Sequence, residues 1–388
     1  MAGAIHDLGA AVVGTGFIGT VHVDALRRVG IQVHGVVGSS STRGAERARA
    51  AGLPPAYGSM EEMLADERVD VVHITSPNHL HHAHAMAALR AGKHVVCEKP
   101  LAMTSVESAE LVRLAQASRL VNAVNFNIRF YPLCQHLHQV VREGGLGEIR
   151  LVTGYYLQDW LVLDTDWNWR LDPALGGTLR AVNDIGSHWL DLTSYLTGSR
   201  VASVSADLET FIKVRRQPAG PVETFAKGAA KETVDREIKT EDCATIQVRY
   251  ENGALGSFAV SQVSPGNKNS LRVEIDGGTS SAAWCSEQPD ELWLGHRDRA
   301  NEVLQRDPAL MNQSGAAASF LPGGHIEGFA DTFRALYIAV YQAVLEGTPA
   351  KDRYPTFSDG HDGVVVCEAI ERSAREGRRV AVERRELG

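Results

Sequence analysis

Two groups of residues in this 388-residue chain have types and spacings that could do chemistry. Gly14, Gly16 and Gly19 form a Gly-x-Gly-x-x-Gly run, whose glycines permit a tight turn and a close backbone approach to a pyrophosphate. Asp184 and His188 are four residues apart, so on a helix they would share one face. Histidine can accept a hydroxyl proton near neutral pH, and a neighbouring carboxylate can orient it. These patterns predict dinucleotide binding and acid–base catalysis.

Each group also has a purely structural interpretation. The glycines can form an ordinary turn, and Asp184 can be a helix N-cap beside a half-buried His188. The surroundings of the glycine run favour the functional interpretation, because it follows a buried strand and opens a helix. The N-terminus of that helix would offer N–H groups and a positive dipole end to phosphates.

Strands and helices alternate over the first 125 residues. Short apolar runs predict the strands, and segments with helical spacing separate them. This alternation is typical of βαβ units and predicts a parallel sheet covered on both faces. The expected strands are 10–13, 31–37, 69–74, 94–98 and 120–125, and the expected helices are 14–30, 42–51, 81–91 and 105–118.

After about residue 126 the pattern changes to strands joined by hairpin turns, which predicts an antiparallel sheet and an α+β fold. Residues 215–240 are charged and contain Pro and Gly, so we expect an exposed loop there. The expected elements are strands 148–156 and 201–214, hairpins 243–263 and 270–287, a final short strand 291–295 and an amphipathic helix 326–346.

Together these elements predict two domains. We expect an α/β Rossmann domain over residues 1–125 and an α+β domain for substrate binding and oligomerisation over residues 126–388. A C-terminal helix is expected at about 358–376, packing back on the Rossmann domain.

Composition argues against several classes of protein. The chain has 39 Lys and Arg residues and 47 Asp and Glu residues, which gives a net charge of −8. Its sequence contains no basic cluster, so nucleic-acid and anionic-membrane partners are not expected. No apolar run is long enough to span a bilayer, and residues 1–9 lack the features of a signal peptide. The five cysteines are odd in number and far apart, which favours a reducing cytoplasm over a disulfide framework or a zinc site.

The residues after the second strand bear on the choice of nucleotide. A carboxylate there would hold the ribose 2′-hydroxyl of NAD, but the chain has Ser39, Ser40 and Arg43, with no acidic residue before Glu46. Hydroxyl groups and an arginine suit a 2′-phosphate, so we expect NAD(P)(H) as the cofactor with a slight preference for NADP(H). The alternative is that Ser39 caps a helix and Arg43 is solvated.

Three further motifs, together with the glycine run, resemble the glucose–fructose oxidoreductase / inositol dehydrogenase / rhizopine-catabolism (Gfo/Idh/MocA) family over nearly the whole chain. The motifs are Thr75-Ser76-Pro77-Asn78-His79-Leu80-His81, Glu98-Lys99-Pro100-Leu101 and Asp184-Ile185-Gly186-Ser187-His188. The resemblance implies a Rossmann domain and a second domain with a large, mostly antiparallel, open-faced sheet. It also implies hydride transfer between nicotinamide C4 and a secondary alcohol or ketone of a sugar, glycoside or inositol. A homodimer or homotetramer formed through the sheet is expected.

The resemblance also assigns roles to residues. It implies catalytic roles for Lys99, Asp184 and His188, with Lys99 placing positive charge where the substrate oxygen becomes alkoxide-like. The residues expected at the cofactor are Gly14, Gly16, Phe17, Ile18, Gly19, Ser39, Ser40, Arg43, Ser76, Pro77, Asn78, His81, Glu98, Lys99 and Asn127. The residues expected at the substrate are Lys99, Arg129, Tyr131, Trp160, Trp169, Arg170, Asp184, His188 and His325.

Several alternatives remain open. The tryptophans near residue 160 could pack on a sugar ring, or could form a core or interface cluster. His79, His81, His82 and His84 suggest a metal, but no Cys or carboxylate is near them in sequence, so no metal is expected. The loop 178–183 before Asp184 is longer than is commonest in the family, which puts the substrate in doubt. An NAD-dependent glycosidase and a non-enzymatic dinucleotide sensor are the alternative functions.

Overall fold

The computed structural model describes residues 4–220, 232–349 and 352–384, and the chain divides into two compact units. Unit 1 comprises the described residues up to Asn127 together with those of 330–364, and unit 2 comprises those of 128–329 and 365–384. The first junction lies two residues from the expected boundary. Residues 330–364, which the sequence analysis placed in the second domain, pack with the first unit instead.

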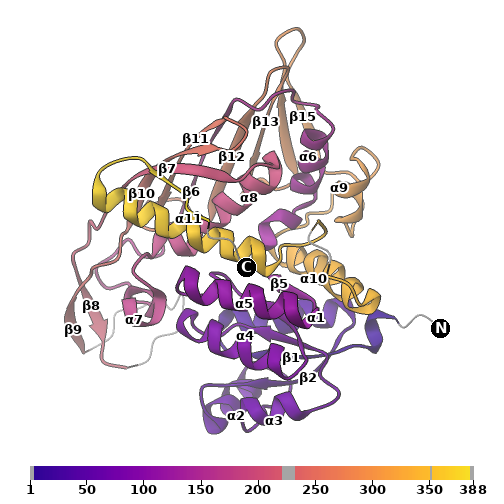
Figure 1. The fold of residues 1–388 in the computed structure, drawn as a ribbon, viewed down its shortest axis with the longest axis vertical. Coiled ribbons are helices and arrows are strands. Elements are labelled where there is room, and N and C mark those ends of the chain that lie inside the picture. The colour runs from indigo at the N-terminus through magenta and orange to yellow at the C-terminus, as the bar shows by residue number, and fades with distance from the viewer. Residues whose placement is uncertain (1–3, 221–231, 350–351, 385–388) are drawn as a thin grey trace. The chain divides into compact units, whose positions relative to one another are not determined.

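Unit 1 contains a five-stranded parallel sheet in the order β2-β1-β3-β4-β5 (Figure 1). The strand order reverses between β1 and β3, and open α/β sheets bind ligands at the carboxyl ends of the strands beside such a switch point. The strands are β1 (Gly9–Val13), β2 (Gln32–Val37), β3 (Val71–Ile74), β4 (His94–Cys97) and β5 (Asn122–Val124).

The helices of unit 1 cover both faces of this sheet, which confirms the α/β class. On β3, Val72 and Ile74 belong to the apolar cluster that includes the helix following this strand, whereas His73 contacts the first helix and a late helix on the other face. The helices are α1 (Phe17–Val29), α2 (Ser41–Ala50), α3 (Met60–Ala65), α4 (His81–Arg90), α5 (Ser105–Ser118) and α10 (Phe329–Glu346). The six-residue α3 was not expected, because it is too short to show a helical period.

Unit 2 is built on a nine-stranded sheet in the order β15-β14-β13-β12-β6-β11-β10-β7-β16. Neighbouring strands are antiparallel except for the parallel pair β6 and β11. The strands are β6 (Leu151–Leu157), β7 (Val201–Glu209), β10 (Cys243–Tyr250), β11 (Leu255–Ser261), β12 (Ser270–Asp276), β13 (Ser281–Cys285), β14 (Glu291–Gly295), β15 (Glu302–Gln305) and β16 (Val380–Ala381). Both predicted hairpins are present, but β15 and β16 follow the strand that was expected to be the last.

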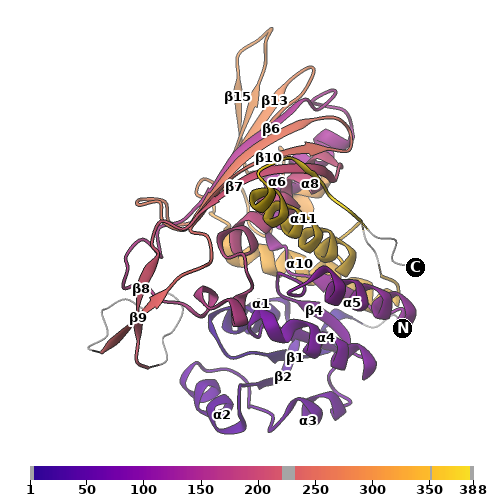
Figure 2. The same cartoon turned by 60° about the vertical axis from the view of Figure 1, so that its left-hand side comes forward.

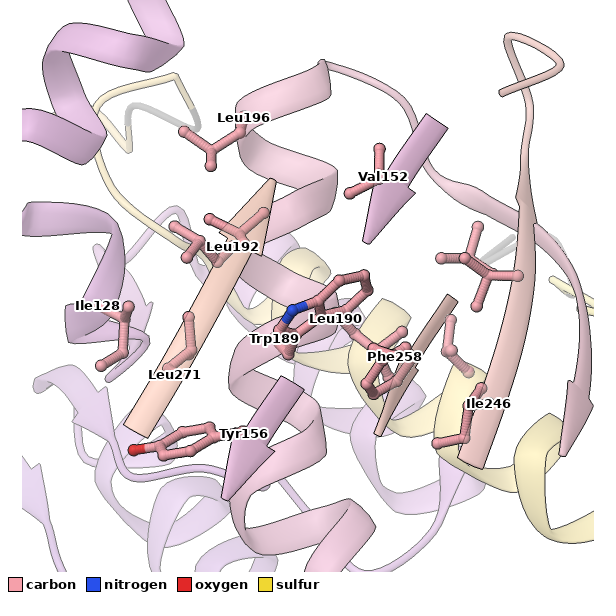
Figure 3. Packing of buried hydrophobic residues seen from close by; sticks show 14 of the residues in the cluster. Ile128, Val152, Tyr156, Trp189, Leu190, Leu192, Leu196, Ile246, Phe258 and Leu271 are labelled. Carbon is pink, nitrogen blue, oxygen red and sulfur yellow. The ribbon is translucent and has the colours of Figure 1, made fainter. Parts of the chain in front are cut away.

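Helices α6, α8 and α11 gather on one face of this sheet, as Figure 2 shows, and contribute apolar residues to its core. Trp189 stacks on Phe258 with ring centroids 4.1 Å apart at the centre of the core (Figure 3). Along β10, buried and exposed residues alternate, so the opposite face of this strand is open to solvent. The helices are α6 (Pro132–Arg142), α7 (Pro173–Gly176), α8 (Ser187–Thr197), α9 (Gln313–Ala317) and α11 (Phe357–Glu376), of which residues 365–376 belong to unit 2.

The expected loop 215–240 instead contains a two-stranded ribbon, β8 (Val214–Pro218) and β9 (Thr233–Glu237). Residues 221–231 of that segment lie outside the described residues. The ribbon is fastened by Arg215, whose fully buried guanidinium donates to the carbonyl oxygens of Leu161 and Leu163. None of the described helices has both the length and the apolar composition needed to cross a membrane.

Candidate active site

The glycine run lies between β1 and α1, at the switch point of the unit 1 sheet. Gly14 has a φ of +120°, and a Cβ there would lie 2.5 Å from Oγ1 of Thr75. A Cβ on Gly19 would lie 2.2 Å from the carbonyl oxygen of Gly14, so packing alone requires both glycines. A Cβ on Gly16 would meet no atom within 4 Å. The space beside Gly16 is therefore open to a ligand.

Gly16 is also the N-cap of α1 and provides no side-chain cap for the helix. The N-terminus of an uncapped helix attracts anions through its N–H groups and its dipole. Phe17 is 54% exposed and Ile18 is half-buried, so the first turn of α1 is accessible. Open space, a helix N-terminus and a switch point together fit the pyrophosphate of a dinucleotide.

The residues after β2 remain on the surface. Ser39, Ser40 and Arg43 are all exposed. The hydroxyl of Ser40 accepts the main-chain N–H of Arg43 at 3.3 Å and so caps α2. The cap is therefore Ser40 rather than Ser39, and it leaves the guanidinium of Arg43 outside the capping interaction.

The loop after β3 is tied to the loop after β4 by His81. Its Nε2 lies 2.7 Å from the carbonyl oxygen of Ser76, and its Nδ1 lies 2.7 Å from that of Pro100. Burial lowers the pKa of His81, against the opposing effects of these two carbonyl groups and of Glu98. Both ring nitrogens contact the protein, so His81 holds the two loops together. Pro77 is half-buried in this loop.

The other histidines of this segment have separate partners. His79 is exposed, His82 contacts Glu110 at 3.0 Å, and Nδ1 of His84 lies 3.0 Å from the hydroxyl of Ser76. Within the described part of the chain, no group of three His, Cys, Asp or Glu side chains could hold a metal ion.

Glu98 and Lys99 follow β4 at the carboxyl end of the sheet. The Glu98 carboxylate is buried, and it accepts the main-chain N–H of Lys99 at 3.1 Å and the side-chain amide of Asn125 at 2.5 Å. Burial by itself would raise the pKa of Glu98, but a hydrogen bond and charge from His22, the charge of Lys99 and the Asn125 amide lower it to about 2. Lys99 is half-buried, and its peptide bond to Pro100 is cis.

Two further residues expected at the cofactor are buried. Asn78 begins a short 3-10 helix (Asn78–Leu80) after β3. Asn127 donates through its side-chain amide to the hydroxyl of Thr332 on α10 at 2.7 Å, and both belong to unit 1. The interaction fastens the end of the first segment of unit 1 to α10.

In unit 2, the predicted acid–base pair lies where two kinds of helix meet. Asp184 is in a π-helical turn (Val182–Gly186), and His188 is in the first turn of α8. A regular α-helix was expected at both residues, which is wrong at Asp184. Wide π-turns of this kind are rare and are found frequently at functional sites.

Asp184 is held by two side chains in different parts of unit 2. Gln262 donates its amide to Oδ2 of Asp184 at 2.8 Å, and Nε of Arg170 lies 3.1 Å from Oδ1. The guanidinium of Arg170 also lies 4.5 Å above the Trp169 ring. Arg170, which was expected at the substrate, therefore contacts the carboxylate of Asp184, another residue expected there. Gln262 was not expected, because it is 78 residues away in sequence.

The π-turn is capped by a buried carboxylate. Oε1 of Glu241 accepts the main-chain N–H of Arg180 at 2.9 Å and that of Val182 at 2.8 Å. Burial raises the pKa of Glu241 to about 7, although these N–H groups and the charge of Arg180 act in the opposite direction. The long loop 178–183 is thereby fixed immediately before Asp184.

His188 is 8% exposed, and its ring faces that of Tyr156 with centroids 6.4 Å apart. The Tyr156 hydroxyl donates to Oδ1 of Asn269, which also accepts the Gln158 amide. Tyr156 is labelled in Figure 3, where it extends from β6 toward the strand that carries Leu271. A polar cluster therefore borders the core beside His188.

The remaining substrate candidates lie in different surroundings in unit 2. Arg129 is buried and binds Asp191 through two hydrogen bonds, of 2.7 and 2.5 Å. Tyr131 packs on Trp284 in the core. Trp160 is half-buried against a small apolar cluster and donates to Gln158 at 2.7 Å. His325 is exposed in the loop before α10.

Comparisons with known proteins agree with this architecture. Residues 8–126 match a family model described as "Oxidoreductase family, NAD-binding Rossmann fold", and residues 134–283 match the "GFO/IDH/MocA C-terminal domain". The levoglucosan dehydrogenase of Pseudarthrobacter phenanthrenivorans is 29% identical over 386 residues, with 95% of this chain and 97% of that protein covered. The uncharacterized oxidoreductase sll0816 of Synechocystis is 33% identical over 75% of each chain.

A solved structure titled "Levoglucosan dehydrogenase, complex with NADH and L-sorbose" superposes with a TM-score of 0.87 at 27% identity. The superposition covers 97% of this chain and 99% of that one. The order of motifs, the two-part architecture and these relatives agree with one another. The chain is an oxidoreductase with an NAD-binding Rossmann fold, and it belongs to the Gfo/Idh/MocA family.

Proposed function

We propose that this protein transfers a hydride between nicotinamide C4 and a secondary alcohol or ketone of a sugar, glycoside or inositol. The observation that carries the proposal is the arrangement of Asp184, which is fixed by Gln262 and Arg170 four residues before His188. A carboxylate with two fixed donors beside a histidine suits proton transfer with a hydroxyl group. The relatives named as levoglucosan dehydrogenases support the substrate class.

The chemistry is an alcohol oxidation, written in one direction. A bound dinucleotide would supply the hydride acceptor at its nicotinamide C4. His188 takes the hydroxyl proton while the carbon–oxygen bond becomes a carbonyl, and Asp184 orients His188 or binds a neighbouring hydroxyl group. The Lys99 ammonium stabilises the oxygen as negative charge develops on it. Ketone reduction is the reverse of these steps.

We assign the cofactor to the carboxyl edge of the unit 1 sheet. The glycine loop and the N-terminus of α1 would hold the pyrophosphate, and the loops after β3 and β4 would lie along the nicotinamide half. The proposed cofactor residues are Gly14, Gly16, Phe17, Ile18, Gly19, Ser39, Ser40, Arg43, Ser76, Pro77, Asn78, Glu98, Lys99 and Asn127. His81 acts on this set through the carbonyl groups that it contacts.

We assign substrate recognition to Trp160, Trp169, Arg170 and His325, together with the three catalytic residues. Half-buried indole rings can pack on the C–H face of a sugar ring, and Trp160 and Trp169 are both half-buried. Arg129 and Tyr131 are proposed to support these residues rather than to contact the substrate. Arg129 is bound to Asp191, and Tyr131 is packed on Trp284.

The test is a panel of monosaccharides, anhydrosugars, glycosides and inositols, each offered with NAD⁺ and with NADP⁺ and followed by NAD(P)H absorbance. Turnover of at least one polyol with net reduction of the cofactor is expected. Cleavage of a glycoside without net cofactor reduction would show an NAD-dependent glycosidase instead. Cofactor binding without turnover of any compound would indicate a sensor.

For the cofactor we propose that NADP(H) is used at least as well as NAD(H). The exposed segment after β2 offers hydroxyl groups and the Arg43 guanidinium, with no carboxylate that would repel a 2′-phosphate. Arg43→Ala is expected to lower kcat/KM for NADP(H) by a factor that corresponds to roughly 1.5–3 kcal/mol, the size of a hydrogen bond to a charged group. The kcat/KM for NAD(H) should stay unchanged. Arg47→Ala, one turn further along α2, is the matched control. Equal losses with both cofactors, or none, would contradict the proposal.

Gln262 gives a further prediction. Gln262→Leu fills much of the same volume with a shorter apolar side chain and removes the amide that donates to Asp184 at 2.8 Å. Because the carboxylate then loses one of its two fixed partners, kcat is expected to fall roughly 10- to 100-fold, the usual cost of a misplaced catalytic group. Steady-state kinetics on the best substrate of the panel measures this, with Gln262→Glu as a second variant that places like charge beside Asp184. Wild-type kcat in a folded Gln262→Leu protein would remove Gln262 from the site.

We also propose that the chain forms a homodimer or homotetramer through the open face of the unit 2 sheet, in a reducing cytoplasm. Support for the interface comes from the exposed residues that alternate along β10, namely Thr245, Gln247 and Arg249. Support for the compartment comes from the cysteines, of which Cys97, Cys134 and Cys367 are buried thiols. Burial raises the pKa of each of these three thiols, so they are held in the unreactive form.

A further inference from the structure

A chain of buried polar side chains crosses unit 1 on the sheet face that α1 and α10 cover. His22 on α1 and His73 on β3 are both fully buried. Their Nδ1 atoms lie 3.1 Å apart, and Nε2 of His73 lies 3.1 Å from the hydroxyl of Tyr341 on α10. Burying imidazole rings costs free energy unless their nitrogens are hydrogen-bonded, and each ring nitrogen here has a partner. Neither histidine was predicted as a site residue.

This series of hydrogen-bonded side chains ends on the carboxylate of Glu98. Nε2 of His22 lies 3.2 Å from Oε1 of Glu98. Because the pKa of Glu98 is held near 2 by His22, Lys99 and Asn125 in spite of burial, the carboxylate is ionised at neutral pH. An ionised carboxylate can only accept hydrogen bonds. Nε2 of His22 therefore carries a hydrogen and donates it to Glu98.

The hydrogen on Nε2 of His22 also determines where the hydrogens lie on His73. A neutral imidazole has one N–H, so a neutral His22 must accept at Nδ1 from His73, whose Nε2 then accepts from Tyr341. If His22 is an imidazolium, its Nδ1 donates to His73, and the hydrogen of His73 moves to Nε2. Burial lowers the pKa of His73 well below its usual value, so His73 carries one hydrogen in both cases. The tautomer of His73 thus reports the charge of His22.

The other oxygen of Glu98 connects the chain to Lys99. Oε2 accepts the main-chain N–H of Lys99 at 3.1 Å, while Asn125 supports Oε1. We propose that His22 is a positioning residue, which acts through Glu98 to fix the main chain at Lys99 and the negative charge beside its ammonium group. The inference rests on the proposed function, in which Lys99 is catalytic.

The first test compares two substitutions at one position. His22→Phe fills the space but donates nothing to Glu98, whereas His22→Gln supplies an amide N–H on a side chain of similar reach. For His22→Phe we expect kcat to fall roughly 10- to 100-fold, with NADH affinity by fluorescence titration and the KM for the substrate nearly unchanged. For His22→Gln we expect most of the lost kcat to return. Failure of the glutamine variant to exceed the phenylalanine variant contradicts the proposal.

A matched control separates positioning from general destabilisation. The Phe333 ring lies 5.7 Å from that of His22 and packs on it without entering the hydrogen-bonded chain. Phe333→Leu should lower the melting temperature but retain kcat. Lys99→Ala is measured in the same assay. If Lys99→Ala is inactive and folded His22→Phe is fully active, this inference fails alone, whereas an active Lys99→Ala overturns the catalytic role of Lys99 in the proposed function.

A spectroscopic test does not depend on activity or on the folding of His22→Phe. Nitrogen-15 chemical shifts of the histidine rings in the wild-type protein give the hydrogen position on each nitrogen. We expect Nε2 of His22 to be protonated and to shift when Glu98 is replaced by Gln, while Nε2 of the exposed His79 serves as the unchanged reference. If Nε2 of His22 carries no hydrogen, the proposed hydrogen bond from His22 to Glu98 is contradicted.

Discussion

Replacing Lys99 by alanine is expected to lower kcat by roughly 10²–10⁴-fold, the size of effect found for positioned groups that assist proton transfer. The expectation follows from its place directly after β4, where its main-chain N–H is fixed on Glu98 and its charge interacts with that carboxylate. The glycine loop is a separate part of unit 1, so NADH binding should survive. His188→Ala is expected to lose a similar factor, because it removes the group proposed to accept the hydroxyl proton.

The control for Lys99 is another lysine of the same unit. Lys93 precedes β4, is half-buried, and donates from Nζ to the carbonyl oxygen of Asp66 at 3.0 Å. Lys93→Ala removes one positive charge from unit 1 at the opposite end of the same strand. It should therefore retain kcat on the best substrate of the panel. Turnover close to that of the wild type in a folded Lys99→Ala protein would remove Lys99 from the catalytic set.

Asp242→Ala is expected to lower the free energy of unfolding by about 3–5 kcal/mol, the cost of breaking a buried ion pair from one side. Asp242, Arg180 and Arg215 have fully buried side chains, and both guanidinium groups contact Oδ1 of the carboxylate. Removing Asp242 leaves two guanidinium groups in the interior without their counter-charge. Burial and the charge of Arg180 already lower the pKa of Arg215, which shows how costly its charge is there.

Urea unfolding measures this loss, and an exposed ion pair of unit 2 provides the comparison. Arg216 contacts Asp164 at 2.7 Å, and about half of each side chain is exposed, at 49% and 52%. Asp164→Ala should leave the unfolding midpoint unchanged, because solvent screens exposed pairs. Asp242→Ala and Asp164→Ala with the same midpoint would contradict the role of Asp242.

Much of unit 1 could be predicted from sequence because its signals are local. Helix α5 was predicted over the residues that it occupies, and its start is fixed locally, because Thr104 accepts the N–H of Glu107 while the Glu107 side chain accepts that of Thr104. The glycine run was recognised from its place after an apolar strand, and the structure shows why Gly14 and Gly19 cannot carry a side chain.

The contacts that complete the site could not be predicted, because they join distant segments. Asp184 and Gln262 are 78 residues apart, and His22 and His73 are 51 apart. Glu241 accepts main-chain N–H groups at the start of the π-turn from residues 61 and 59 positions away, which residue spacing does not reveal. A histidine within the otherwise apolar strand Val71–Ile74 was the one signal of the buried chain in unit 1.

Ribosomes deliver this chain from its N-terminus, so residues 128–329 are all synthesised before α10 emerges. Until then, the face of the first sheet that carries His73 lacks Tyr337 and Tyr341, whose rings pack on it in the finished protein. The first unit therefore completes its fold late in translation. A nascent chain that stops before residue 330 presents to chaperones and proteases the part of this face that α10 covers in the finished protein, although its five strands are already present.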